Sequence, residues 1–403
     1  MDLRSRLAKL DRAAGRPAPG SAPAGTGDRQ ARAVVGELPA ELGLREEATP
    51  DGPCWYREWR ECADGPDEVL PDLGGILTHR QPRAAARGDV LLLDTETTGL
   101  AGGTGTLAFL VGVGWWEGSE LVVRQLFLPG PGREAGLLAA LAQWSARFSA
   151  VVTYNGASFD LPLLRTRALM NRRADPLGHL DSWDLLPAAR RLWGRVLPDC
   201  RQQTVEASIC GLARAEGDIE GFRIPEVWRD WLGGSGTDDL LCVLRHNQRD
   251  VRGMAAILGR ACAARQALDR PAAPGPGDPL RAWTLARVAQ RRRDHAAAAD
   301  WITVALSTGS GPAGVDGQLL ARDAVPMLKR VGRWSELERL LGARIAAGAG
   351  AWAHREAAIL YERRLHRLDK ALFHAGQADE SARVARLKRR LERAAGTRKA
   401  EGP

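Results

Sequence analysis

Lysine is scarce in this chain of 403 residues. Five lysines stand among its 57 basic residues, and none occurs between Lys9 and Lys329. A carboxylate that is buried in this long stretch has only arginine or a metal ion to neutralise it. The scarcity matters because several acids of the stretch fall where side chains are expected to be buried.

The cysteine pattern and the hydropathy argue against a cysteine-bound metal cluster, a disulfide framework and a membrane span. The six cysteines contain no C-x-x-C pair, so a cysteine-held metal cluster and a disulfide framework are both disfavoured. No apolar run approaches the length of a membrane span, and no apolar segment of the signal-peptide kind opens the chain. We therefore expect a cytoplasmic protein with reduced thiols.

Positive charge is in excess, and arginine supplies nearly all of it. The formal net charge is +8 and the sequence pI is about 9.6. Arginine binds phosphate through two parallel hydrogen bonds, which suits a nucleic-acid partner. Alanine, glycine and arginine are enriched together, however, so genomic base composition explains the charge equally well. The charge alone leaves both explanations open.

An α/β pattern begins at Val90. The run Val90-Leu-Leu-Leu predicts a fully buried strand. Short connections to two more apolar stretches predict a three-strand antiparallel meander, and alternating helices and strands then predict a mixed sheet with parallel strands. The expected strands are 90–94, 107–116, 121–128 and 151–154, and the expected helices are 134–148, 161–170, 185–193 and 237–264.

The remaining segments differ from this domain in composition. Residues 1–50 are rich in alanine, glycine, proline and arginine and are expected to be disordered, apart from a short helix with Leu3, Leu7 and Leu10 on one face. Residues 51–85 interleave aromatic and charged side chains, which predicts a flap packed on the next domain, or alternatively a surface that stacks bases. The predicted α/β domain (86–268), Pro/Gly linker (269–279) and tetratricopeptide-like helical domain (280–403) follow.

Two carboxylates, Asp94 and Glu96, end the first predicted strand. Residues two apart in extended backbone point to the same face. Two like charges at the end of a buried strand are costly unless a cation neutralises them, and Mg²⁺ or Mn²⁺ prefers such oxygen ligands. Asp-x-Glu also occurs in solvated turns, so the interpretation depends on matching acids elsewhere.

Matching acids do occur elsewhere in the chain. Asp160 follows the fourth strand, and Asp250 lies on the long helix one turn after His246. Each has an ordinary explanation: Asp160 as a helix N-cap, Asp250 on a solvated helix face, and His246 as a core histidine. Taken together with the first pair, they predict a site for two divalent ions, suited to phosphodiester cleavage, with His246 as general base.

Three segments resemble the motifs of the DEDD exonucleases, which have a ribonuclease H-like fold. They are Asp94-x-Glu96, Asn155-x-x-x-Phe159-Asp160 and the pair His246 and Asp250. More specifically, the chain is similar to the YprB-like branch of that superfamily over about residues 50–265. The stretches that carry this resemblance are 94–100, 154–164, 184–193 and 246–251.

The resemblance implies a metal-dependent 3′→5′ exonuclease that acts on DNA, with a role in repair. It assigns the metal ligands to Asp94, Glu96, Asp160 and Asp250. Candidate supporting residues are Asp184 and Asn155, and candidate substrate contacts are Thr97, Gly102, Gly103 and Phe159. An ordinary tight turn explains the two glycines equally well.

His246 departs from the pattern of the wider superfamily. Histidine-type members place the histidine five residues before the last aspartate, and tyrosine-type members place a tyrosine four residues before it. Here a histidine stands at the tyrosine spacing. Its assignment as general base is therefore weaker than that of the metal ligands.

Other functions fit the same residues. The site could process RNA, or cut internally as a ribonuclease H-like endonuclease, because two-metal chemistry does not require a 2′-hydroxyl. A helical-repeat scaffold with a degenerate nuclease domain is a third alternative, against which the retention of every expected acid argues. The helical tail implies a protein partner, such as a helicase.

Overall fold

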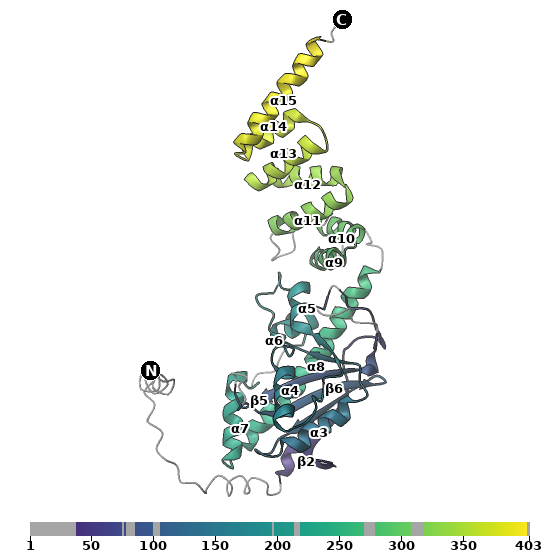
Figure 1. Cartoon of the computed structure of the whole chain (residues 1–403), viewed down its shortest axis with the longest axis vertical. Helices are drawn as coiled ribbons and strands as arrows, with labels where there is room; N and C mark the ends of the chain where they lie inside the picture. Colours follow the sequence, from purple (N-terminus) through teal and green to yellow (C-terminus); the bar gives the residue numbers. More distant parts are fainter. Residues whose placement is uncertain are drawn as a thin grey trace, which may run out of the picture.

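A computed structural model describes residues 38–74, 76–77, 85–99, 105–195, 197–212, 218–269, 279–307 and 317–400 of the chain. An α/β domain occupies the lower part of the view in Figure 1, and a stack of helices continues from it toward the C-terminus. The predicted fold class, an α/β domain with a mixed sheet followed by an all-helical region, is confirmed.

Seven strands form the main sheet in the order β1-β2-β7-β6-β5-β8-β9. The central strands β5, β6 and β7 are the predicted antiparallel meander, while β8 pairs in parallel with β5 and β9 in parallel with β8. The strands are β1 (Arg45–Thr49), β2 (Gly52–Cys62), β5 (Val90–Thr97), β6 (Ala108–Glu117), β7 (Glu120–Phe127), β8 (Ala150–Thr153) and β9 (Asp181–Asp184). A small second sheet pairs β3 (Val69–Leu70) with β4 (Ala85–Ala86).

The sheet begins earlier in the chain than the sequence predicts. Residues 40–49, expected to be disordered, contain a 3₁₀ turn (Ala40–Leu42) with Leu42 fully buried and the edge strand β1. Strand β2, expected to be a flap, pairs antiparallel with β7. Its aromatic side chains lie on both faces of the sheet, with Tyr56 against one core cluster and Trp59 against the other, and Glu58 accepts a 2.5 Å hydrogen bond from Arg124 of β7. The predicted helix with Leu3 lies outside the described residues.

Helices cover both faces of the sheet. Leu91 and Leu93 of β5 enter one core cluster, and Val90 and Leu92 enter the other, as alternation along a strand requires. The helices of this domain are α3 (Glu134–Ser145), α4 (Asp160–Met170), α5 (Leu185–Leu192), α6 (Gln202–Val205), α7 (Ile224–Leu232) and α8 (Thr237–Leu268), with the short turns η3 (Glu206–Cys210) and η4 (Gly221–Arg223). The strand β9 and the helix α7 were not predicted.

Helix α8 lies unusually close to strand β6 because β6 contains glycine where the two elements cross. A Cβ atom on Gly114 would lie 2.6 Å from Val251 Cγ1, and one on Gly112 would lie 2.1 Å from Asn247 Oδ1. Both distances are shorter than any ordinary contact between carbon or oxygen atoms. The missing side chains therefore let α8 bring residues 246–250 onto the end of β5.

The C-terminal region is a run of helices in which each packs on the next. They are α9 (Pro279–Arg291), α10 (His295–Ser307), α11 (Gly317–Val331), α12 (Trp334–Ala346), α13 (Ala351–Arg363), α14 (Leu368–Gln377) and α15 (Ser381–Ala400), and they share a core of their own. The helical character is confirmed, whereas a tetratricopeptide-like repeat stays a prediction. Among the described helices, none combines the length and the hydropathy that a membrane span needs.

The close packing of α8 on β6 yields a stability prediction. We expect Gly114→Ala to lower the free energy of unfolding by about 1–3 kcal/mol, because the new methyl group overlaps Val251 and overpacked cores lose that much. Urea denaturation measures the change. Gly342→Ala in α12 is the control: its Cβ would meet nothing within 4 Å, so stability should be unchanged or rise by about 0.5–1 kcal/mol. Equal stability of Gly114→Ala and the wild type would contradict the packing.

Candidate active site

The first two acids end the central strand. Asp94 and Glu96 lie near the C-terminal end of β5, two residues apart, and the pairing of β5 with β6 becomes irregular directly after Glu96. The Glu96 side chain is buried. Asp94 Oδ2 accepts a 2.8 Å hydrogen bond from Asn247 Nδ2 of α8. The strand and the helix thus hold these carboxylates at the point where the two elements meet.

Asp160 reaches the same place from the neighbouring strand. Because β8 is parallel to β5, the loop that follows β8 emerges at the edge where Asp94 and Glu96 lie. Asp160 opens α4, and Oδ1 accepts a short hydrogen bond from the hydroxyl of Thr95 on β5. A Cβ on Gly156 would lie 2.7 Å from Asp160 Oδ2, so only glycine permits this approach. Asp160 is therefore more than a helix cap.

Asp184 holds the loop that carries Asp160. Its Oδ1 accepts hydrogen bonds from the backbone N–H of Asn155 at 2.8 Å and of Leu186 at 2.9 Å, and Oδ2 accepts one from Ala157 at 3.3 Å. Asn155 adopts a left-handed backbone conformation with φ of 67°, which asparagine tolerates better than most residues. Asp184 thus ties the end of β9 to the loop after β8. The structure gives it a positioning contact with the loop backbone.

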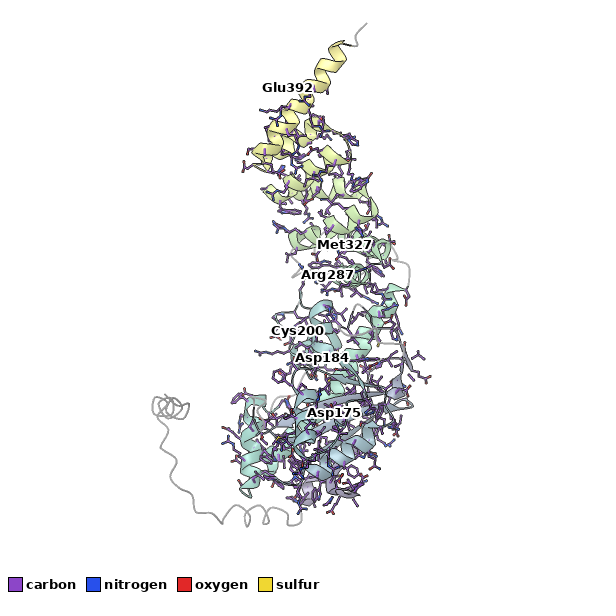
Figure 2. The ribbon with its side chains drawn as sticks, viewed as in Figure 1. Asp175, Asp184, Cys200, Arg287, Met327 and Glu392 are labelled. Carbon is purple, nitrogen blue, oxygen red and sulfur yellow. The ribbon has the colours of Figure 1, made fainter. Side chains whose placement is uncertain are left out.

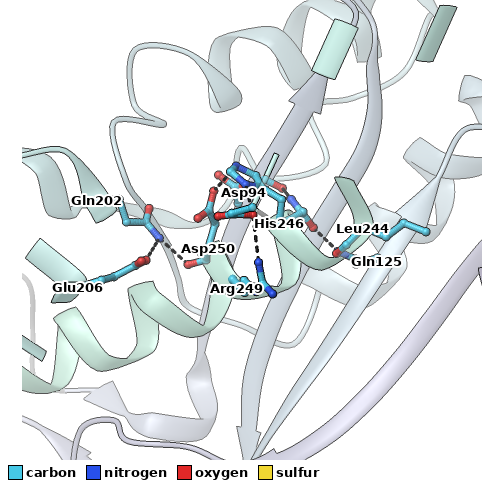
Figure 3. A network of polar contacts seen from close by, with 10 residues as sticks. Asp94, Gln125, Gln202, Glu206, Leu244, His246, Arg249 and Asp250 are labelled. Carbon is cyan, nitrogen blue, oxygen red and sulfur yellow. Dashed lines mark hydrogen bonds and ion pairs between the residues drawn. The ribbon is translucent and has the colours of Figure 1, made fainter. Parts of the chain in front are cut away.

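Helix α8 supplies His246 and Asp250 (Figure 3). His246 Nε2 lies 3.3 Å from Asp250 Oδ2, as residues one helical turn apart allow, and Nδ1 lies 3.1 Å from Asp218 Oδ1. Arg249 also donates to Asp218 at 3.1 Å. One ligand atom each of Glu96, His246 and Asp250 falls within 4.8 Å of the others. The histidine is buried and oriented by a carboxylate on each side.

Three amides that the sequence analysis missed support the acids. Gln125 Nε2, on β7, donates to Asn247 Oδ1 at 2.7 Å, and Asn247 in turn donates to Asp94. Gln202 Nε2 donates to the Asp250 carbonyl at 2.7 Å and to Glu206 at 2.8 Å. A glutamine inside the apolar strand Leu121–Phe127 was a signal that a buried polar partner exists. No pattern in the sequence identifies that partner as Asn247.

Burial and neighbouring carboxylates shift the pKa values of these acids. Burial is the largest cause that raises the pKa of Asp94 well above its usual range, followed by the charges of Asp250, Glu96 and Asp160, while the Asn247 hydrogen bond opposes the rise. Burial likewise raises the pKa of Asp160 to about 6, against the hydrogen bond from Thr95. A compact group of buried and half-buried carboxylates whose negative charge is disfavoured fits a divalent cation. The residues present therefore suit the metal that the sequence predicts.

The structure describes two of the four predicted substrate contacts, Thr97 and Phe159. Phe159 is 56% exposed directly before Asp160. The Thr97 hydroxyl donates to the Gly99 carbonyl at 2.9 Å, within the turn that leaves β5. Gly102 and Gly103 lie outside the described residues. The structure brings Asp94, Glu96, Asp160, His246 and Asp250 together, while the catalytic role of each stays a prediction.

Comparisons with known proteins concern the same part of the chain. Residues 91–262 match the RNase_H_2 family of the RNase_H superfamily. Over 172 residues the chain is 34% identical to the uncharacterized protein YprB of Bacillus subtilis (strain 168), which is 42% of this chain and 41% of YprB. The chain thus spans about two fifths of the length of that relative. The family B DNA polymerase of the archaeon Pyrobaculum calidifontis is similar with a TM-score of 0.33 and 13% identity, over 69% of this chain and 34% of the polymerase, a level too low to support an argument.

The raised pKa of Asp160 predicts how the metal-free protein responds to pH. Between its ordinary value of 3.8 and about 6, the folded protein retains a proton on Asp160 that the unfolded chain has released. The contribution of this group to stability is therefore present at low pH and is lost as pH rises through about 6. Asp160→Asn removes the titration. We expect the thermal midpoint of this variant, relative to wild type in EDTA, to be higher at pH 7 than at pH 5.

The comparison between variant and wild type cancels the titration of carboxylates outside the site, while the loss of the Asp160 charge also relieves the raised pKa of Asp94 and so acts in the same direction. Burial alone would raise the pKa values of Glu58 and Glu362, but bound arginines lower them. These two residues contribute equally to the pH dependence of both proteins. A midpoint difference that is the same at pH 5 and pH 7 would contradict the burial of a negatively charged Asp160.

Proposed function

We propose that the chain, whose residues 91–262 match the RNase_H_2 family of the RNase_H superfamily and are similar to YprB, is a metal-dependent nuclease that hydrolyses phosphodiester bonds. The observation that carries the proposal is the meeting of Asp94, Glu96, Asp160 and Asp250 from β5, α4 and α8 at one edge of the sheet. Without bound cations, the negative charges of these acids would repel a phosphate. With divalent cations bound, the site would attract one.

Asp94, Glu96, Asp160 and Asp250 would hold Mg²⁺ or Mn²⁺, with two ions as the expectation. Bound divalent ions of this kind make an attacking water more acidic and stabilise the charge on the leaving oxygen. The chain's own part is to fix the ligands. Asn247 orients Asp94, Thr95 orients Asp160, and His246 lies against Asp250. Residues that orient ligands in this way contribute strongly to metal affinity.

His246 is proposed as the proton acceptor. The contact with Asp218 favours the tautomer that carries its proton on Nδ1. Nε2 lies on the side of Asp250 and Glu96; with a cation on Asp250, it would be free to accept a proton from water. The spacing of four residues therefore suits the role, because one helical turn points the ring at the acids. Asp218 is a positioning residue in this account.

The substrate is proposed to be DNA, cleaved from its 3′ end, with a role in repair. The polarity and the role follow from the resemblance to the DEDD exonucleases. The exposed ring of Phe159, next to Asp160, offers a face on which a terminal base could stack. The alternatives are an RNA substrate and internal cleavage. The helical region is proposed to bind a protein partner, for which a helicase is the expectation.

A nuclease assay with matched variants tests the proposal. We expect Asp160→Asn to lower the rate of cleavage by at least about 100-fold, because metal-ion stabilisation of charge is worth several kcal/mol. Asp239→Asn, an exposed acid in the first turn of α8, is the control and should cleave as fast as wild type. Linear and circular DNA and RNA, labelled at either end, are incubated with Mg²⁺ or Mn²⁺. Cleavage by Asp160→Asn at the wild-type rate would reject the site.

A second assay separates positioning from direct participation. Asp218→Asn preserves the size of the side chain but changes the hydrogen bond to His246 Nδ1. We expect kcat to fall on the order of 10–100-fold, the usual effect of removing an orienting carboxylate, with KM nearly unchanged and an altered pH–rate profile. His246→Ala should lose more. If Asp218→Asn keeps the wild-type kcat and pH profile, the proposed tautomer has no catalytic importance.

A further inference from the structure

Helix α9 joins the helical stack to the α/β domain. Its Thr284 hydroxyl donates a 2.9 Å hydrogen bond to the carbonyl of Leu192, the last residue of α5. Val288 is buried in the core cluster that holds side chains of α5 and α8, and Arg292 donates to the Gly74 carbonyl at 2.7 Å. Arg287, labelled in Figure 2, lies where the stack meets the domain. The two parts thus share a packed junction.

A cavity of about 400 Å³ lies at this junction. Its walls come from α5, η3, α8 and α9, and we call it the junction cavity. The lining side chains used below are Trp193, Ile209, Arg260, Leu280, Arg281 and Thr284. Arg260 stands ten residues after Asp250 on α8, which is about 15 Å along the helix axis. The junction cavity is therefore separate from the candidate active site.

Two guanidinium groups of the junction cavity lack an acidic partner. Arg260 and Arg281 are both exposed, and within the described ranges neither forms an ion pair with a carboxylate. Asp64 lines a smaller adjoining hollow of about 230 Å³ together with Arg260. The Arg260 side chain also interacts with the Cys210 thiol, but no carboxylate neutralises either cation within the described ranges, so both can bind an anion that enters from solvent.

Arginines at the end of α5 and on α9, beyond the lining of the junction cavity, lie close enough to affect one another's charge. Asp323 is shared by Arg195 at 3.5 Å and Arg287 at 3.6 Å. Burial, followed by the charge of Arg195, lowers the pKa of Arg287, and burial followed by the charge of Arg291 lowers that of Arg191. Arginines that disfavour each other's charge are stabilised when an anion binds nearby. The junction is therefore suited to an anionic ligand.

The walls restrict the ligand further. Trp193, Ile209 and Leu280 supply an aromatic and aliphatic surface, and tryptophan is a platform on which nucleobases stack. Arginine matches the geometry of phosphate oxygens. The volume is within the range of about 300–1,000 Å³ that small-molecule sites have, and such sites favour domain interfaces. A ligand with a planar ring system and a phosphate group fits the apolar walls, the arginines and the volume.

We propose that the junction cavity binds a nucleotide, with the phosphate held by Arg260 and Arg281 and the base packed against Trp193. The nucleotide has two sources with the same chemistry: a free mononucleotide, or one unit of a nucleic-acid strand that passes the junction. The proposal goes beyond the nuclease function and does not depend on cleavage, because the lining residues are distinct from the acids of the candidate active site.

Binding measurements on the full chain in EDTA, where cleavage by metal is suppressed, test this site. Calorimetry measures the affinity for AMP and dAMP, and fluorescence anisotropy measures that for a short fluorescein-labelled single-stranded oligodeoxynucleotide. We expect Arg260→Ala/Arg281→Ala to weaken binding of at least one of these probes by about tenfold or more, since charge-assisted hydrogen bonds are lost. Mononucleotide binding that the double variant abolishes identifies the free source, and weakened oligonucleotide binding alone identifies the strand.

The matched control is Arg330→Ala/Arg389→Ala. Both residues are exposed arginines of the helical region that do not line the junction cavity, so the variant has the same net charge as the test variant. It should bind every probe within about twofold of wild type. Circular dichroism confirms that both variants are folded. The proposal is overturned if wild type binds none of the probes, or if the two double variants bind them equally well.

Discussion

Mutual repulsion among buried and half-buried carboxylates is the constraint on which the rest of this structure depends. Burial raises the pKa of Asp94, and the charges of Asp250, Glu96 and Asp160 raise it further. Such a group is stable only when protons or cations neutralise it. No lysine stands between Lys9 and Lys329. The fold nevertheless brings these acids together from three elements, and the neighbouring amides and hydroxyl hold them in place instead of separating them.

Backbone features bring the acids this close. Glycines 112 and 114 allow α8 to approach β6, and Gly156 leaves room for the Asp160 carboxylate. Asp184 fixes the loop between β8 and α4 through the backbone N–H groups of Asn155 and Ala157. Each of these positions is either a glycine, which leaves room for close approach, or a residue whose hydrogen bonds fix the loop that carries Asp160. The site is thus specified over a much larger part of the chain than its ligands occupy.

The sequence predicted those parts of the structure whose signals are local. The meander, the helix α8 and the acids at strand ends follow from runs of apolar residues and from what stands where they stop. The strands β1 and β2 were missed because the alternation in residues 54–59 becomes interpretable only beside β7. The strand β9 was missed because its four residues include two acids. Asn247, Gln125 and Asp218 support the site through contacts between segments 28–153 residues apart, which no local pattern contains.

Anomalous X-ray scattering from crystals grown with Mn²⁺ tests whether these acids form a divalent-metal site. We expect an anomalous peak within coordination distance of carboxylate oxygens of Asp94, Glu96 and Asp250, with Asp160 at the same centre, and loss of that peak in Asp94→Asn. Crystals in which Mn²⁺ binds elsewhere, or in which the four acids remain together without any ion at saturating Mn²⁺, would contradict it.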